Sequence, residues 1–190
     1  MRGALPRQRT PLHLHPDDCY DTPAAAVLAL LGCESLPARI WEPACGTGNI
    51  VGVLRGAGRR VVATDLNDRG CPSSRAGVDF LQRRRITADA IVTNPPYALA
   101  ERFVAAAIER APLVIMLLRL AFLESMRRAP LLDGGQLARI HVFANRLPMM
   151  HRAGWKGRRA SSAIPFAWFV WDRAHRGPAT VDRIRWEAAA

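Results

Sequence analysis

Short apolar runs alternate with amphipathic stretches along most of this chain. The apolar runs are rich in Val, Ile, Leu, Phe and Trp, which is typical of strands covered on both faces. The predicted strands are residues 38–44, 59–66, 78–81, 88–94, 113–119, 138–144 and 166–172. The amphipathic stretches predict helices at residues 24–31, 50–58, 98–111 and 122–129, the first with Thr22 as its N-cap and Pro23 at its first position.

Strands that alternate with helices predict an α/β fold around a mostly parallel sheet. The length of 190 residues suits one well-packed domain. Residues 1–18 are rich in Pro and Arg without periodicity and predict a flexible basic tail, followed by a single domain over residues 19–190. A basic stretch without a strand or helix pattern, residues 145–165, separates the last two predicted strands.

Positive charge changes this picture by pointing to a polyanionic partner. The formal net charge is +11, from 27 basic and 16 acidic residues. The excess is uneven, because no Asp or Glu occurs between Asp133 and Asp172. A basic region of this kind is typical of a nucleic-acid-binding surface, although a coding bias towards Arg would also raise the charge.

The cysteine pattern and the N-terminus indicate a soluble protein in the cytoplasm. The four cysteines are scattered and form no CxxC pair, so neither zinc nor another bound metal is expected. No apolar signal segment follows the N-terminal arginines, and the apolar run at residues 22–33 is too short to span a bilayer. We therefore expect free thiols in a reducing compartment and no membrane association.

Polar residues follow several predicted strands where a parallel sheet binds its ligands. Glu42, Asp65, Asp79 and Asn94 come at or near the carboxyl ends of successive strands. The Gly-rich turn of residues 42–49, EPACGTGN, lets the backbone approach a ligand closely. Because the turn lacks the lysine of a phosphate-binding loop, and Asp65 is placed to accept hydrogen bonds from ribose, we expect a cofactor that contains a nucleoside but no triphosphate, namely S-adenosylmethionine.

With TDL, VDFL and NPPY downstream, this turn resembles the class I methyltransferases, and among them the amino-group (N6-adenine) DNA methyltransferases of the small phage type. The resemblance covers about residues 19–172 and implies a Rossmann-like fold with an antiparallel late strand and helices on both faces of the sheet. It departs from restriction-type enzymes because the chain has no room for a separate target-recognition domain. Target recognition is then expected to be short, weak, or provided by the basic region or by a partner.

The resemblance also implies roles for individual residues. Those near the methionine end and the ribose of S-adenosylmethionine would be Tyr20, Thr22, Pro23, Glu42, Pro43, Ala44, Cys45, Gly46, Gly48 and Asp65. Around its adenine they would be Leu66, Asp79 and Phe80, with Asn94 between cofactor and substrate. Phe80 is also an ordinary core candidate, and Cys45 is expected to be a small buried residue rather than a nucleophile.

The motif of residues 94–97, NPPY, predicts the catalytic residues Asn94, Pro95, Pro96 and Tyr97. The amino nitrogen of adenine is a weak nucleophile because its lone pair is delocalised into the ring. The Asn94 side-chain oxygen and the Pro95 carbonyl would each accept a hydrogen bond from one of its two N–H groups. The prolines fix the turn, and Tyr97 would stack on a base flipped out of the duplex.

These features predict an S-adenosylmethionine-dependent DNA methyltransferase acting on N6 of adenine. A methyltransferase acting on an rRNA base amine or a protein glutamine amide is the first alternative, because each presents an sp² nitrogen. A catalytically inactive nucleic-acid-binding protein of the same fold is the second. Nucleic-acid contacts are expected at Arg152, Trp155, Lys156, Arg158 and Arg159, against the alternative of a solvated loop. The oligomeric state is left open.

Overall fold

The computed structural model describes residues 20–82, 86–149 and 164–186. Its strands are β1 (Arg39–Glu42), β2 (Arg60–Ala63), β3 (Ala90–Thr93), β4 (Leu113–Arg119), β5 (Leu137–Phe143), β6 (Phe166–Asp172) and β7 (Thr180–Ile184). Its α-helices are α1 (Ala24–Leu31), α2 (Asn49–Gly56), α3 (Ala100–Arg110) and α4 (Ala129–Leu132), and its short 3₁₀ turns are η2 (Tyr97–Leu99), η3 (Leu120–Leu123) and η4 (Met126–Arg128). No helix in these ranges is long and apolar enough to cross a membrane.

The strands form one mixed sheet in the order β2-β1-β3-β4-β6-β5-β7. Strands β1 to β4 pair in parallel, and β5 pairs in parallel with β7. Strand β6 runs antiparallel to both of its neighbours, β4 and β5. The predicted Rossmann-like architecture, mostly parallel with one antiparallel late strand, is therefore confirmed.

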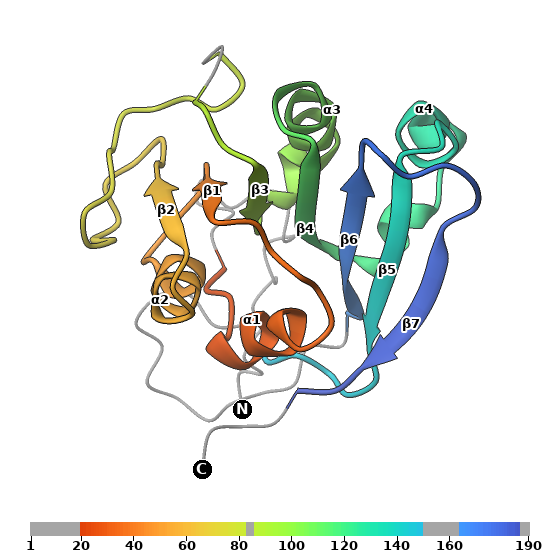
Figure 1. Cartoon of the computed structure of the whole chain (residues 1–190), viewed down its shortest axis with the longest axis horizontal. Coiled ribbons are helices and arrows are strands. Elements are labelled where there is room, and N and C mark those ends of the chain that lie inside the picture. Colours follow the sequence, from red (N-terminus) through yellow and green to blue (C-terminus); the bar gives the residue numbers. More distant parts are fainter. Residues whose placement is uncertain (1–19, 83–85, 150–163, 187–190) are drawn as a thin grey trace, which may run out of the picture.

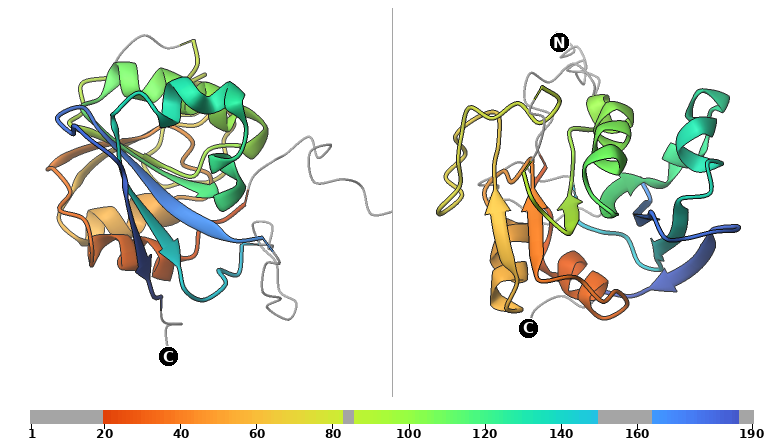
Figure 2. Two further views of the ribbon diagram at one scale, coloured as in Figure 1. Left: turned by 90° about the vertical axis from the view of Figure 1, so that its right-hand side faces the viewer. Right: turned by 45° about the horizontal axis from the view of Figure 1, so that its top comes forward.

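Helices cover both faces of the sheet (Figure 1), as predicted. Helices α1 and α2 lie on one face, and α3 and α4 lie on the other, in both views of Figure 2 as well. The buried side chains of β4 alternate between two core clusters: Ile115 and Leu117 pack with α1 and α2, whereas Val114 and Met116 pack with α3. A strand buried on both faces explains the continuous apolar run LVIMLLR.

The register of the parallel strands brings their carboxyl ends to one edge. Glu42 at the end of β1 pairs with Ala63 at the end of β2. Thr93 at the end of β3 lies beside Met116, so β4 continues three residues further, to Arg119. The segments that follow β1, β2 and β3 therefore begin close together, while β4 projects beyond them.

The strand predicted at residues 78–81 is wrong. Here the chain turns, because the Asp79 Oδ1 atom accepts a hydrogen bond from the Leu81 amide at 2.8 Å. An Asp side chain that binds the backbone two residues ahead offers the chain an alternative to strand pairing. The loop returns to the end of β2, where the Val78 amide donates to the Asp65 carbonyl at 3.0 Å.

The helix predicted at residues 122–129 is also wrong, since this stretch contains η3, η4 and the first residue of α4 instead. Ser125 interrupts it with φ 96° and ψ 117°, a backbone conformation that non-glycine residues seldom adopt. The first helix covers the predicted residues 24–31, but the prediction of Thr22 as its N-cap and Pro23 as its first residue is wrong. Pro23 occupies its N-cap position, and no side chain caps it.

Candidate functional site

A cavity of about 560 Å³ lies at the carboxyl ends of β1, β2 and β3. Its walls come from the turn after β1, the loop after β2 and the turn after β3, closed by residues 20–22 and the start of α3. Of the predicted site residues, those lining the cavity are Tyr20, Thr22, Pro43, Ala44, Cys45, Gly46, Asp65, Leu66, Asp79, Phe80, Asn94, Pro95, Pro96 and Tyr97. Pro23, Glu42 and Gly48 are not part of the lining.

Two glycines shape the turn after β1. Gly46 has φ 53°, and its amide donates to the Asp65 Oδ2 atom at 2.9 Å. Gly48 has φ 95°, and a Cβ atom there would lie 2.8 Å from the Cys71 sulfur. Gly48 thus permits the turn to pack against the loop after β2. Burial raises the pKa of the neighbouring Cys45 thiol, which suits a wall residue rather than a nucleophile.

Asp65 links the turn after β1 to the loop after β2. Its Oδ2 atom accepts from the Gly46 amide, and its Oδ1 atom accepts from the Asn67 amide at 2.9 Å. A carboxylate has further lone pairs, so it still has capacity for ligand hydroxyl groups. The next residue, Leu66, lines the cavity with 60% of its surface exposed, which leaves an apolar surface for a flat ring.

Asp79 and Phe80 complete this side of the cavity. Phe80 is 2% exposed and packs against Trp41 and Phe103, with ring centroids 5.1 and 4.8 Å away. It is therefore a core residue that also contributes to the lining. The turn that replaces the predicted strand is what carries Asp79 to the cavity.

Glu42 lies fully buried behind the turn. Its Oε1 atom accepts hydrogen bonds from the Thr93 hydroxyl and, at 3.1 Å, from the Ala44 amide. Its Oε2 atom has no hydrogen-bond partner among the described residues. Burial raises the pKa of Glu42 to about 8, although both hydrogen bonds oppose that shift. Its predicted contact with the cofactor stays a prediction.

The Asn94 side chain lies at the cavity with an unpaired oxygen. Its Nδ2 atom donates to the Tyr20 carbonyl at 3.0 Å, which fixes the orientation of the amide because the reversed amide would set two oxygens together. Its Oδ1 atom is buried without a hydrogen-bond partner among the described residues. Buried carbonyl oxygens usually have a partner, so an open one at a cavity is typical of a ligand site.

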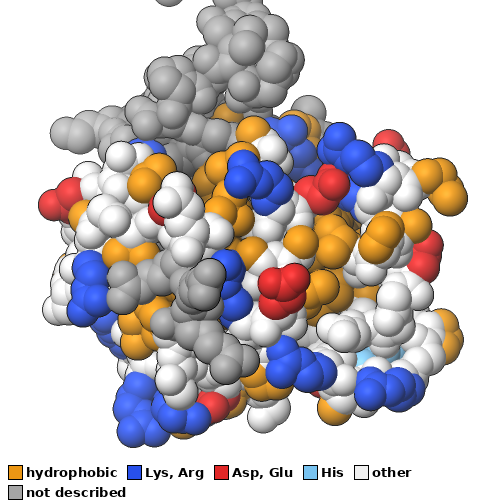
Figure 3. All heavy atoms as spheres, turned by 90° about the horizontal axis from the view of Figure 1, so that it is seen from above, with side chains coloured by type: hydrophobic (Ala, Val, Ile, Leu, Met, Phe, Trp, Pro, Cys, Tyr) orange, Lys and Arg blue, Asp and Glu red, His pale blue; other side chains and the backbone are white. Residues whose placement is uncertain are grey.

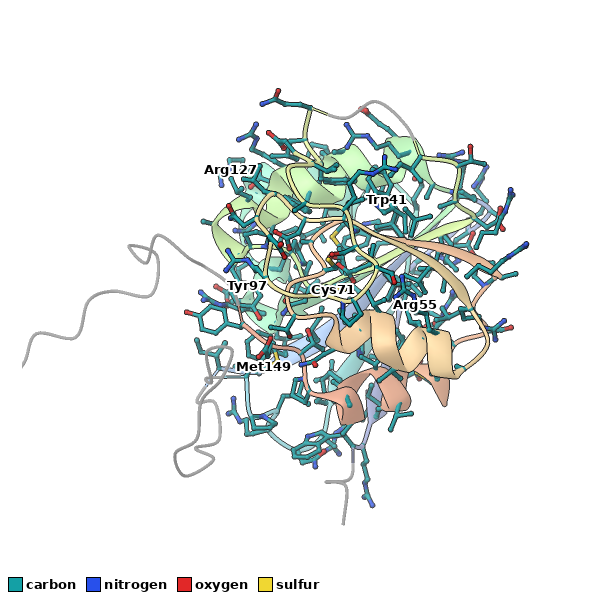
Figure 4. All side chains as sticks on the ribbon, turned by 90° about the vertical axis from the view of Figure 1, so that its left-hand side faces the viewer. Trp41, Arg55, Cys71, Tyr97, Arg127 and Met149 are labelled. Atoms are coloured by element: carbon teal, nitrogen blue, oxygen red, sulfur yellow. The ribbon has the colours of Figure 1, made fainter. Side chains whose placement is uncertain are left out.

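Aromatic residues surround the NPPY turn. The Tyr97 ring stacks with the Tyr20 ring at 5.6 Å and lies 5.7 Å from the Phe166 ring. Figure 4 shows Tyr97 and Arg127 on one side of the molecule, and Trp41 and Arg55 towards the other.

The sequence pattern missed other lining residues, including Arg102 and Asp21. The Asp21 carboxylate accepts a hydrogen bond from the Thr47 hydroxyl at 2.7 Å. A turn before the first helix gives no periodic signal by which Asp21 could have been found.

The predicted nucleic-acid-binding residues Arg152, Trp155, Lys156, Arg158 and Arg159 lie outside the described residues, as does the predicted tail. The described ends of the basic stretch are informative. Met149 and Phe166 are buried in the core cluster against which Tyr97 packs. The stretch therefore leaves and re-enters the fold near the NPPY turn.

No protein-family model and no curated protein sequence matches the chain. Solved structures do match. A Pyrococcus horikoshii protein described as an RNA methyltransferase shares 14% identity with a TM-score of 0.56, over 87% of this chain and 90% of its own.

A modification subunit described as part of a type I restriction enzyme, from Vibrio vulnificus, shares 14% identity with a TM-score of 0.59, over 86% of this chain but only 46% of its own. Magnesium protoporphyrin IX methyltransferase from Synechocystis, with bound S-adenosylmethionine, shares 11% identity with a TM-score of 0.53, over 80% of this chain and 77% of its own. These likenesses show that the chain has the fold of S-adenosylmethionine-dependent methyltransferases.

Proposed function

We propose that this protein is an S-adenosylmethionine-dependent methyltransferase that transfers a methyl group to N6 of adenine in DNA. The observation that carries the proposal is the buried, open Oδ1 atom of Asn94 at the cavity. An acceptor held in this way suits an amine whose N–H bonds need partners during the reaction.

The cavity fits the cofactor by its chemistry. Asp65 offers carboxylate oxygens for the ribose hydroxyls, and the exposed Leu66 offers an apolar surface for adenine. The turn of residues 43–46 would surround the methionine end. When bound, S-adenosylmethionine supplies an electrophilic methyl group on a positively charged sulfur.

The protein's part in the reaction is to orient and polarise the amine. The Asn94 oxygen and the Pro95 carbonyl would each accept a hydrogen bond from one of its N–H groups. These two hydrogen bonds would localise the nitrogen lone pair. That pair forms the new N–C bond while the C–S bond breaks, and the excess proton then leaves to water. Fixed acceptors aimed at developing positive charge require no rearrangement at the moment of transfer.

Charge, structural similarity and an aromatic ring support nucleic acid as the substrate. The net charge is +11, and the acid-free stretch between Asp133 and Asp172 includes Phe166, whose ring lies 5.7 Å from the Tyr97 ring. The similar structures include a protein described as an RNA methyltransferase and a modification subunit of a restriction enzyme. Tyr97, which lines the cavity, provides an aromatic surface for a base that has left its duplex.

A transfer experiment with tritium-labelled S-adenosylmethionine tests the proposal. Adenine-containing DNA, total RNA and a protein extract are offered in separate reactions, and label is expected in DNA. Label in RNA or protein alone would contradict the DNA assignment and select a base amine of rRNA or a glutamine amide instead. Absence of cofactor binding by calorimetry would contradict every enzymatic function and favour an inactive nucleic-acid-binding protein.

A further inference from the structure

Arg119 contacts the Tyr97 ring from outside the cofactor cavity. Its guanidinium carbon lies 4.5 Å from the ring centroid. Phe166, its partner in the β4–β6 register, contacts the same ring. Neither residue belongs to the described lining of the cavity, whereas Tyr97 does. Tyr97 therefore separates the cofactor cavity from a second group of residues at the ends of β4 and β6.

The position of Arg119 suits an approaching substrate. It ends β4 three residues beyond Met116, which is level with Thr93 at the end of β3. At about 3.3 Å per residue, this extension places Arg119 roughly 10 Å past the level at which the NPPY turn begins. The neighbouring segment of residues 120–128 is attached to α3 through the ion pair of Arg127 with Glu101 at 2.8 Å. Figure 3, which looks onto the face carrying α3 and α4, shows basic, acidic and hydrophobic side chains interspersed there.

The Arg119 guanidinium has unused binding capacity. Its Nε atom is buried and has no hydrogen-bond partner within the described ranges, and no carboxylate there forms an ion pair with it. Arg128 makes a useful comparison, since it also lies over a ring, that of Phe122, at 4.8 Å. Arg128, however, donates to the carbonyls of residues 121, 122 and 124. The Nε atoms of both arginines are buried without a hydrogen-bond partner in the described ranges, so the difference lies in the outer nitrogens, which in Arg119 form no hydrogen bond to a described residue.

The magnitudes favour exchange of the guanidinium for a base. A cation–π contact contributes about 0.5–2 kcal/mol. Stacking of a base on an aromatic ring contributes about 1–3 kcal/mol. Replacing one by the other on Tyr97 is therefore close to neutral, and a released guanidinium gains a charge-assisted bidentate contact if a phosphate lies within reach.

We propose that Arg119 is a substrate-binding residue. In the free protein it covers the Tyr97 ring, and when the target base stacks on that ring, Arg119 binds the phosphate of the target nucleotide instead. The inference rests on the proposed function, because a flipped base must stack on Tyr97. It also provides a basis for selecting a nucleotide over a glutamine side chain, which has no phosphate.

The test compares wild type with Arg119→Met, Arg119→Lys and the control Arg60→Met. Arg60 is an exposed arginine at the first residue of β2, at the opposite edge of the sheet. The substrates are short DNA duplexes with one target adenine, either fully charged or carrying a neutral methylphosphonate at one position near that adenine. We measure KM and kcat for methyl transfer, and DNA binding by fluorescence anisotropy at several salt concentrations.

Arg119→Met is expected to raise KM about tenfold and to reduce the slope of binding against salt by about one phosphate contact. The KM and salt slope of Arg119→Lys, which keeps the charge but lacks the planar guanidinium, should lie between those of wild type and Arg119→Met. A methylphosphonate at the phosphate that Arg119 binds should weaken DNA binding by wild type about tenfold and leave DNA binding by Arg119→Met unchanged. Arg60→Met should behave as wild type. Unchanged cofactor affinity by calorimetry confirms that each variant is folded.

The inference would be overturned if every methylphosphonate position weakened DNA binding equally in wild type and Arg119→Met. An unchanged salt slope for Arg119→Met would also overturn it. A fall in kcat at constant KM would assign Arg119 a structural role instead. The binding measurement does not depend on transfer. Wild type that binds DNA through Arg119 but methylates only protein would contradict the proposed function and not the phosphate contact.

Discussion

Glu34 precedes β1 and Glu42 is its last residue, and both are buried, yet their neighbours differ. Glu34 is 9% exposed and binds Arg139 at 2.5 and 3.2 Å and the His141 Nε2 atom at 2.7 Å. Glu42 is 0% exposed and has only a hydroxyl and one backbone amide as partners. One carboxylate has cationic partners, and the other has none.

The pKa values follow from this difference. Burial acts to raise the pKa of Glu34, but hydrogen bonds from His141 and Arg139 outweigh it, and the pKa is lowered. Contacts with Cys33 and Glu34 raise the pKa of His141 to about 9. Burial without a cation raises the pKa of Glu42 to about 8. Ion-paired side chains therefore link the segment after α1 to β5. Unpaired buried oxygens lie instead at the end of β1 and just after β3, where a cationic cofactor and an amine would bind.

Asn94→Ala removes the open acceptor that the proposed reaction needs most. We expect kcat to fall about 10²–10³-fold, as it does when one aligned hydrogen-bonding group is lost from a catalytic site. Cofactor binding should be retained, while stability should fall by about 1 kcal/mol because the variant also loses the hydrogen bond from the Nδ2 atom to the Tyr20 carbonyl. Transfer assays measure kcat, and calorimetry measures cofactor affinity. Turnover near the wild-type rate would disprove the role of Asn94.

Glu34→Gln tests the satisfied region. The change leaves Arg139 and His141 without a carboxylate, and we expect a loss of about 2–3 kcal/mol in unfolding free energy by urea titration at pH 7. The matched control is Asp89→Asn, which breaks the ion pair of Asp89 with Arg39. That pair is 36% and 48% exposed, so its loss should cost less than about 1 kcal/mol. Equal losses would remove the distinction between the two kinds of carboxylate.

Glu42→Gln tests the pKa of the unpaired acid. A carboxyl group whose pKa is raised on folding binds more protons in the folded state, so stability falls as pH rises from 4.5 towards about 8. Between about pH 5.5 and 6.5, wild type should lose up to about 1.4 kcal/mol per pH unit. Glu42→Gln should be flat in this window, and parallel curves for the two proteins would contradict the assignment.

Asp65→Asn should have the smallest effect of the four. Its side chain accepts backbone amides from Gly46 and Asn67, and an amide retains only one of the two acceptor oxygens. We expect cofactor affinity to fall about tenfold by calorimetry, which corresponds to about 1.4 kcal/mol. Unchanged affinity would place the ribose elsewhere in the cavity.

The sequence predicted the sheet well where burial determines the pattern. Strand β4 is covered on both faces, so its apolar run identified it, and the polar residues at the strand ends predicted where the cavity would lie. Strand β7 was missed because it is a mostly exposed edge strand with the mixed sequence TVDRI. The ion-pair cluster was missed because Glu34 and His141 are 107 residues apart, and no local pattern relates them.

The residues around the NPPY turn were harder to predict for a similar reason. Asn94 and Tyr97 belong to a short motif, but the contact of Arg119 with Tyr97 depends on β4 extending past β3. Such an overhang depends on strand register, which apolar runs do not specify. The turn at Asp79 depends on a side-chain hydrogen bond that competes with strand pairing, although the residues favoured a strand.

The most direct test of the central claim is the identity of the methylated atom. DNA treated with the protein and S-adenosylmethionine is digested to nucleosides and analysed by liquid chromatography and mass spectrometry. The account predicts N6-methyl-2′-deoxyadenosine from wild type and its near absence from Asn94→Ala. Methyl groups on a ring nitrogen, on cytosine alone, or at equal levels from both proteins would contradict it.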